Sequence, residues 1–183
     1  MKEPMAPISI VRAAILLVVA SGLRATHAAA YPAPTYSGSL KILETETVGN
    51  GTLTWYGVAS VARRDVDVRL SPRECGSNDV TCDWENNRAQ SELCDKLINI
   101  LIATGSTAVS RSPRSMCYAE GENACCVSWA DPMSGPRSDF VPAAQKTYND
   151  CSNGMVSGYA RDVNLSGVCT TQCLSDRPSG CED

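Results

Sequence analysis

Residues 115–130 read SMCYAEGENACCVSWA, and this stretch decides the fold because it holds two strand-like segments, a turn and two adjacent cysteines. Residues 115–119 and 124–130 are predicted strands, and the short polar stretch between them is typical of a tight turn. Neighbouring side chains of a strand point to opposite faces of a sheet. Cys125 and Cys126 are therefore predicted to face opposite sides, one toward a helix layer and the other toward the outer surface or an added loop.

A helix is predicted on each side of this stretch. One apolar stripe with the period of an α-helix runs through residues 83–104. Asp83 is predicted to cap the start of this helix, and Gly105 to close its end in the left-handed conformation. A second helix is predicted over residues 139–151, with Ser138 as its cap and a proline in its first turn.

Two further strands complete the predicted order. Residues 65–70 (DVDVRL) alternate strictly between polar and apolar, which predicts a half-buried strand. Residues 155–165 are the last predicted strand. The order from residue 65 onward is then β-α-β-β-α-β, the split β-α-β arrangement. The expected fold class is α+β, an antiparallel sheet with two helices on one face, stapled by disulfides.

The segment upstream of this core is predicted to form a hairpin. Residues 40–43 and 52–59 are its two strands, and Asn50-Gly51 is the predicted turn. We expect a single cysteine-rich domain over residues 40–183, with its cysteine core over residues 75–181.

The N-terminus has the pattern of a secretory signal peptide. Lys2 and Arg12 precede an apolar run at residues 13–23, which is shorter than the roughly 20 residues that a membrane span needs. Small residues before the cut predict cleavage after Ala30, which makes residues 1–30 the signal peptide. Residues 31–39, rich in Pro, Ser and Gly, are predicted to be a flexible lead-in. The expected localisation is secreted, extracellular, without a membrane span.

The composition excludes several functional classes. The chain has 183 residues, 20% of them charged, and a net charge of −4, which argues against a nucleic-acid partner. Removing the signal peptide takes away His27, the only histidine. A mature chain without histidine has no Ser-His-Asp triad and no His-ligated zinc. We expect no metal site and no cofactor.

The cysteines indicate an oxidising compartment. All ten lie between residues 75 and 181, and such a density is typical of secreted disulfide scaffolds. An even number predicts five disulfides and no free thiol, but the spacing leaves the partners open. Cys94, on the apolar stripe of the first helix, is expected to lie in the layer that one of the adjacent cysteines faces. The predicted disulfide residues are Cys75, Cys82, Cys94, Cys117, Cys125, Cys126, Cys151, Cys169, Cys173 and Cys181.

Other sites in the sequence concern processing and modification. Asn50 and Asn164 stand in N-x-S/T sequons and are candidate glycosylation sites. Arg63-Arg64 is either a dibasic processing site or two solvated charges, and we favour the solvated charges.

Carboxylates offer the main alternative, a small hydrolase of cell-wall polysaccharide. Such an enzyme needs two acids across a cleft, and indole rings would supply stacking platforms for sugar. The candidate tryptophans are Trp55, Trp84 and Trp129. The candidate acids are Asp79, Asp83, Glu85, Glu120, Glu122, Asp131, Asp139 and Asp162.

Several segments together resemble a known family. These are CGSNDVTC, CDKLINIL, CCVSW, SGYARDVNLSGVC and CLSDR, which begin at Cys75, Cys94, Cys125, Ser157 and Cys173. They resemble the small secreted fungal proteins of the WD-like domain family, which is unrelated to WD40 propellers. The ten cysteines and the strand-helix order are also similar to the smut-virus killer-toxin fold, an α/β-sandwich with five disulfides.

This resemblance implies a secreted, non-enzymatic protein of the toxin or effector kind. Members of the toxin family inhibit the growth of other fungi or plant cells and perturb calcium uptake. No catalytic residue is carried over, and the basic functional surface of the toxin has no matched lysine in this acidic chain.

The expected function is therefore that of a disulfide-rich interaction protein, effector or killer-toxin-like, and not an enzyme. Its expected target is an extracellular protein, a cell wall or a membrane surface, and the chain is expected to be a monomer. The alternatives are the hydrolase and a structural wall or surface protein without a discrete target.

Overall fold

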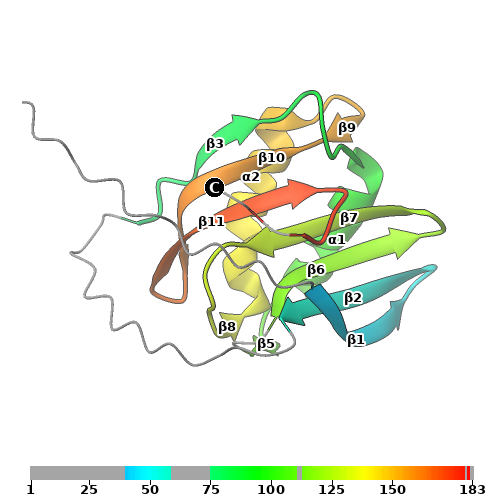
Figure 1. Cartoon of the computed structure of the whole chain (residues 1–183), viewed down its shortest axis with the longest axis horizontal. Helices are drawn as coiled ribbons and strands as arrows, with labels where there is room; N and C mark the ends of the chain where they lie inside the picture. Colours follow the sequence, from blue (N-terminus) through cyan, green and yellow to red (C-terminus); the bar gives the residue numbers. More distant parts are fainter. Residues whose placement is uncertain (1–39, 59–74, 111–112, 180, 182–183) are drawn as a thin grey trace, which may run out of the picture. The chain divides into compact units, whose positions relative to one another are not determined.

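The computed structural model describes residues 40–58, 75–110, 113–179 and 181, which all belong to one compact unit. Within these residues, seven strands form an antiparallel sheet in the order β1-β2-β6-β7-β11-β10-β3 (Figure 1). The strands are β1 (Leu40–Val48), β2 (Gly51–Val58), β3 (Asp79–Cys82), β6 (Pro113–Glu120), β7 (Asn123–Trp129), β10 (Gly158–Leu165) and β11 (Val168–Ser175).

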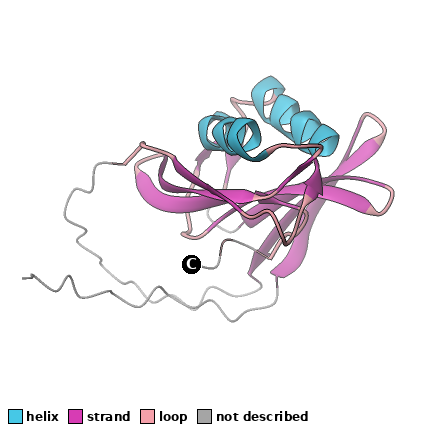
Figure 2. Ribbon diagram, turned by 90° about the horizontal axis from the view of Figure 1, so that it is seen from above, coloured by secondary structure: helices cyan, strands magenta, loops and turns pink. Residues whose placement is uncertain are grey.

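Two helices cover one face of this sheet. They are α1 (Ser91–Ala103) and α2 (Val141–Cys151), and Figure 2 shows both on the same side. A 3₁₀ helix, η1 (Arg137–Phe140), leads into α2. Two short ladders stand apart from the main sheet: β4 (Ala89–Gln90) with β9 (Met155–Val156), and β5 (Ala108–Val109) with β8 (Gly135–Pro136).

The predicted hairpin at the start of the domain is confirmed, but its turn lies one residue earlier than predicted. Val48 pairs with Gly51, so the two-residue loop is Gly49-Asn50. Gly49 has a φ of +60°, whereas Asn50 is not among the positive-φ residues. A glycine with positive φ at the first loop position is the requirement of a type II′ turn, which matches the twist of the strands.

The first predicted helix is confirmed in its C-terminal part only. The helix α1 begins at Ser91, eight residues after the predicted cap at Asp83. Its buried residues are Leu93, Cys94, Leu97, Ile98 and Leu101, all on the predicted stripe. The predicted left-handed closure at Gly105 is wrong, because that glycine does not have a positive φ. Instead, the Thr104 hydroxyl and backbone N–H both donate to the Ile100 carbonyl, at 2.7 and 2.9 Å.

The second predicted helix is confirmed with a different start. Residues 137–140 form the 3₁₀ turn, α2 follows from Val141, and Ser138 makes no capping hydrogen bond to it. The proline stands in the first turn of α2, where backbone N–H groups have no partner within the helix, so its missing N–H costs no hydrogen bond.

The two central predicted strands are confirmed as β6 and β7, and the last as β9 and β10. The split β-α-β order is not confirmed: β11, which was not predicted as a strand, lies between β7 and β10. The sheet edge beyond β10 is β3, a four-residue strand that the sequence did not reveal. The strand predicted at residues 65–70 lies outside the described residues, as do residues 1–39 and the Arg63-Arg64 pair.

The core lies between the sheet and the helices. Trp129 of β7 packs against Phe140, with the ring centroids 4.5 Å apart and the ring planes tilted by 43°, and both rings are fully buried. Arg137 is buried beside them, with its guanidinium 4.8 Å from the centre of the Trp55 ring and a 3.1 Å hydrogen bond to the Thr104 hydroxyl. This arginine therefore connects the end of α1 to strand β2. In the described part of the chain, no helix has the length and apolar character needed to span a membrane.

Candidate binding groove

All ten cysteines lie in the described residues, and they pair in five disulfides. The adjacent pair faces opposite sides, as predicted. Cys125 faces the helices and bonds to Cys94 of α1, whereas Cys126 faces outward and bonds to Cys117 on the neighbouring strand. The other three bridges are Cys75–Cys169, Cys82–Cys151 and Cys173–Cys181.

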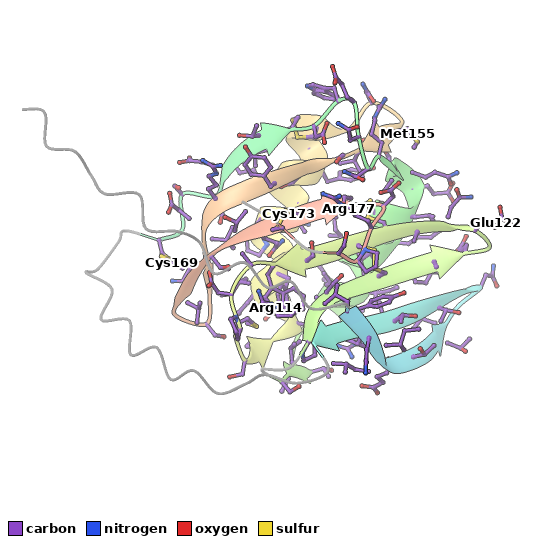
Figure 3. The ribbon with its side chains drawn as sticks, viewed as in Figure 1. Arg114, Glu122, Met155, Cys169, Cys173 and Arg177 are labelled. Atoms are coloured by element: carbon purple, nitrogen blue, oxygen red, sulfur yellow. A yellow bond between two sulfur atoms is a disulfide. The ribbon has the colours of Figure 1, made fainter. Side chains whose placement is uncertain are left out.

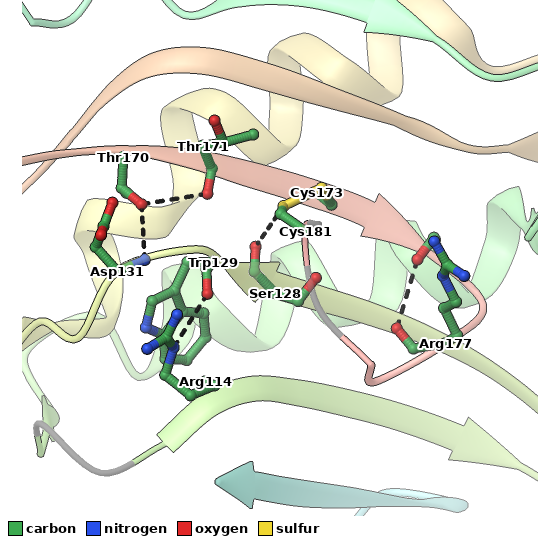
Figure 4. The surroundings of a disulfide bond; sticks show 10 residues. Arg114, Ser128, Trp129, Asp131, Thr170, Thr171, Cys173, Arg177 and Cys181 are labelled. Atoms are coloured by element: carbon green, nitrogen blue, oxygen red, sulfur yellow. Dashed lines mark hydrogen bonds between the residues drawn. A yellow bond between two sulfur atoms is a disulfide. The ribbon is translucent and has the colours of Figure 1, made fainter. Parts of the chain in front are cut away.

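The bridge between Cys173 and Cys181 holds the C-terminal tail on the sheet face away from the helices. Cys173 pairs in register with Ser128 of β7, and the Cys181 sulfur lies 3.5 Å from the Ser128 carbonyl (Figure 4). The tail leaves β11 through a turn at Arg177, whose carbonyl accepts a long hydrogen bond from the Ser175 hydroxyl at 3.5 Å. Figure 3 shows Cys173 and Arg177 close together on this face of the sheet.

An open groove lies beside this tail, at the edge where β3 and β11 end and β10 begins. Gly158 pairs with Cys82 on one side and Leu174 on the other, so the three strand ends meet there. The groove has a volume of about 490 Å³. Side chains from the loop after β3, from β10 and from the tail line it: Asp83, Trp84, Glu85, Tyr159, Ser175 and Arg177.

Trp84 is the most exposed aromatic side chain among the residues that line this groove. All three tryptophans lie in the described residues, and their exposed fractions are 4% for Trp55, 1% for Trp129 and 50% for Trp84. The first two are core residues rather than binding platforms. Trp84 is therefore the one indole of the chain that a ligand can reach.

The loop that carries Trp84 is held in place at both ends. Cys82, at the end of β3, is bonded to Cys151 of α2. The Asp83 carboxylate accepts hydrogen bonds from the backbone N–H groups of Glu85 and Asn86, both at 3.0 Å. These bonds, with that from Asn86 as the larger effect, lower the pKa of Asp83. The Asp83 N–H in turn donates to the Ser157 carbonyl at 2.9 Å, so the turn is fixed to the segment before β10.

The tail is joined directly to the same loop. The Asp176 N–H donates to the Asn87 carbonyl at 2.9 Å. On the far side of the groove, the Arg161 guanidinium lies 5.2 Å from the centre of the Tyr159 ring and covers one of its faces. The groove thus has short, tethered walls rather than long loops.

The structure brings together two of the eight candidate acids, Asp83 and Glu85, as groove-lining residues. Glu122 lines a separate small hollow of about 130 Å³ near Arg88. The other five lie elsewhere: Asp79 in β3, Glu120 in β6, Asp131 after β7, Asp139 in η1 and Asp162 in β10. A general acid needs a raised pKa, and the two acids of this set with a resolved shift, Asp83 and Glu120, both have a lowered pKa.

Glu120 belongs to a polar cluster between α1 and the end of β6. The Lys96 ammonium donates to both of its carboxylate oxygens, at 3.0 and 2.9 Å, and the Tyr118 hydroxyl donates to one of them at 2.8 Å. These hydrogen bonds, first that from Lys96, lower the pKa of Glu120, and they raise the pKa of Lys96 and of Tyr118. The cluster also reaches Val48, whose carbonyl lies 3.3 Å from the Tyr118 hydroxyl. We interpret it as a structural link between helix and sheet.

Both predicted glycosylation sites are exposed. Asn50 lies in the β1–β2 turn, and Asn164 lies near the end of β10, where its side-chain oxygen accepts a hydrogen bond from Gly167 N–H at 2.8 Å. Glycosylation of either residue stays a prediction, as does cleavage after Ala30. Across the ranges that the structure describes, no three His, Cys, Asp or Glu side chains gather as a possible metal site.

The groove itself was not predicted from the sequence. Arg177 and Tyr159 lie in segments quoted for the family resemblance, but neither was predicted to bind a ligand, because each is a single residue without a motif around it. The one available signal was Trp84, a large aromatic residue in a stretch of Asp, Glu and Asn.

The family described as Fungal WD-like matches residues 47–181. No curated protein and no solved structure matches the chain. The predicted likeness to the killer-toxin fold is thus not confirmed.

Proposed function

Because the chain belongs to the fungal WD-like family, we propose that it is a secreted, non-enzymatic interaction protein that acts outside the cell. In this proposal it is effector-like or killer-toxin-like, works as a monomer and uses the groove around Trp84 to bind its target. Removal of residues 1–30 would precede its release.

The observation that carries the proposal is the exposure of Trp84. Burying a tryptophan on binding contributes far more than burying a small side chain, and Trp is enriched among the residues that dominate binding energy. This indole is half-exposed on a turn that a disulfide and two backbone hydrogen bonds hold in place. Trp84 lies outside the buried cluster that joins sheet and helices, so its indole is available to contact a ligand.

The disulfides support the extracellular part of the proposal. Five bridges are compatible with an oxidising compartment and are rare in reducing ones. They also favour binding over catalysis by a flexible site, because walls that are ordered before binding lower the entropic cost of association.

The test is association of the labelled, oxidised protein with intact fungal and plant cells, with two matched variants. Trp84→Ala removes the groove indole, and Ile102→Ala removes a side chain of similar exposure, 51%, on α1. We expect the protein to bind cells, Trp84→Ala to bind at least tenfold more weakly, and Ile102→Ala to bind like the wild type. Equal binding by both variants, or no association with any cell, would overturn the proposal.

One specific observation supports the hydrolase alternative: Asp83 and Glu85 line the same groove. Its test is release of sugars from chitin, β-glucan, pectin and peptidoglycan by the wild type, Glu85→Gln and Asp83→Asn. The asparagine keeps an oxygen that accepts the two backbone N–H bonds, so this variant removes the acid without removing the turn. Turnover that disappears in either variant would establish the alternative in place of the proposal.

A further inference from the structure

We infer that the Trp84 groove binds a neutral carbohydrate chain, an inference that rests on the proposed function and names its ligand class. The charges on the walls come from Asp83 and Glu85 on one loop and Arg177 on the other. Two acids and one arginine leave a net charge of −1, so a polyanion is not attracted, and a polycation gains only one unpaired negative charge and meets Arg177 at the tail. A neutral polar ligand fits this balance best.

The apolar part of the groove suits a sugar ring. A flat aromatic face carries partial negative charge and attracts the weakly positive C–H groups that line one face of a pyranose. Trp84 offers such a face at 50% exposure. Tyr159, whose ring is already covered on one side by Arg161, contributes its remaining ring surface and its hydroxyl.

The polar part supplies both donors and acceptors, as sugar hydroxyls require. Tyr159 provides a hydroxyl, Asn87 an amide, Glu85 a carboxylate and Arg177 a guanidinium, all on residues that line the groove. Hydroxyls and amides can each adapt to a sugar hydroxyl as donor or acceptor. A groove of about 490 Å³ falls within the range of about 300–1,000 Å³ that is common for small-ligand sites. Because it is open, a chain can continue beyond it.

The two walls are pre-ordered with respect to each other. One wall follows Cys82, which is bonded to α2, and the other lies within the loop closed by the Cys173–Cys181 bridge. The hydrogen bond from Asp176 N–H to the Asn87 carbonyl joins them. A weakly binding ligand class such as neutral sugars needs this low ordering cost to reach useful affinity.

The test is binding of the oxidised protein to six probes. Chitohexaose, laminarihexaose and cellohexaose are neutral, polygalacturonate is anionic, chitosan is cationic, and a cell-surface protein extract represents peptide targets. Because the other two tryptophans are buried, a change in tryptophan fluorescence on titration of the wild type reports on Trp84. Titration calorimetry compares the affinities of the variants, since two of them lack this indole. We expect one neutral oligosaccharide to bind, at least tenfold loss with Trp84→Ala, partial retention with Trp84→Phe, and no change with Ile102→Ala.

Unfolding temperatures of the variants show whether a loss of binding is merely a loss of fold. Binding only to polygalacturonate or chitosan, or wild-type affinity in Trp84→Ala, would overturn the inference. Trp84-dependent binding to cells that protease treatment abolishes would also overturn it while leaving the proposed function standing. Absence of binding to both sugars and cells would overturn both.

Discussion

The disulfide between Cys82 and Cys151 is expected to stabilise the fold more than the bridge between Cys117 and Cys126. Cys82 and Cys151 are 69 positions apart, and Cys117 and Cys126 only 9. The Cys94–Cys125 bridge lies within the longer loop and shortens it to about 40 residues in the otherwise cross-linked chain. Loop-closure entropy then gives about 4 kcal/mol for Cys82–Cys151 and about 3 kcal/mol for Cys117–Cys126.

The comparison is between the double alanine variants C82A/C151A and C117A/C126A, unfolded by heat and by denaturant without reductant. Cys117, Cys126 and Cys151 are buried, whereas Cys82 is only partly buried. Any greater loss of packing in C117A/C126A therefore acts against the expected order. For a domain of this size, about 1 kcal/mol corresponds to about 2–4 °C. We expect the first variant to melt about 8–16 °C below the wild type and the second about 6–12 °C below, a difference of about 2–4 °C. An equal or larger loss in C117A/C126A would refute the loop-length argument.

The same pair of variants separates stability from binding. Cys82 immediately precedes Asp83 and the turn that carries Trp84, whereas Cys117 and Cys126 lie in the middle of β6 and β7. Well below the unfolding temperature of either variant, C82A/C151A is therefore expected to lose groove binding, and C117A/C126A is expected to keep it.

Three smaller changes probe other contacts. Gly51→Ala is expected to lower the free energy of unfolding by about 1–3 kcal/mol, because an added Cβ would lie 2.5 Å from the Tyr118 ring. Denaturant unfolding measures this change, and an unchanged midpoint would contradict the predicted overlap. Glu120→Gln is expected to flatten the acid side of the stability profile, since a lowered pKa gives stability that is present above the ordinary value of 4.5 and lost as the pH falls through the folded value. A profile as steep as that of the wild type between pH 5 and 3 would contradict this. Arg137→Met is expected to lower the free energy of unfolding by about 2 kcal/mol, because it removes the charged hydrogen bond to Thr104 and the contact with Trp55. The midpoint of thermal unfolding measures this loss. A variant as stable as the wild type would show that the two contacts are dispensable.

The elements that the sequence predicts well have a local signal. The apolar stripe of α1 locates that helix by its period. The strands β6 and β7 are buried along most of their length, and the polar turn between them locates them. β11 was missed because its helix-facing side holds Thr170, Gln172 and Leu174, of which only the last is apolar. Gln172 is buried all the same, since its amide donates to the Phe140 carbonyl at 2.9 Å. Because the hydrogen-bond partner of this buried side chain lies 32 positions away, the sequence around Gln172 has no apolar alternation that would predict a strand.

The error at Asp83 has a similar physical origin. Its carboxylate does accept the N–H groups two and three residues on, as an N-cap does. The turn is not continued, because the chain next forms the short ladder between β4 and β9 and only then enters α1 at Ser91. The cap-like hydrogen bonds of Asp83 therefore lie eight residues before the start of α1. Part of the segment between them lines the groove.

The groove and the core use almost separate sets of residues. Trp84, Glu85 and Arg177 belong to the groove and are absent from the buried cluster that holds sheet and helices together. The walls are tied to the core by two disulfides and by backbone hydrogen bonds, which depend little on the identity of the groove side chains. A change at these positions is therefore expected to alter the ligand at small cost to the fold. We therefore expect residues 83–87 and 175–177, rather than the core, to determine which ligand binds, and variants at these positions are the direct test of function.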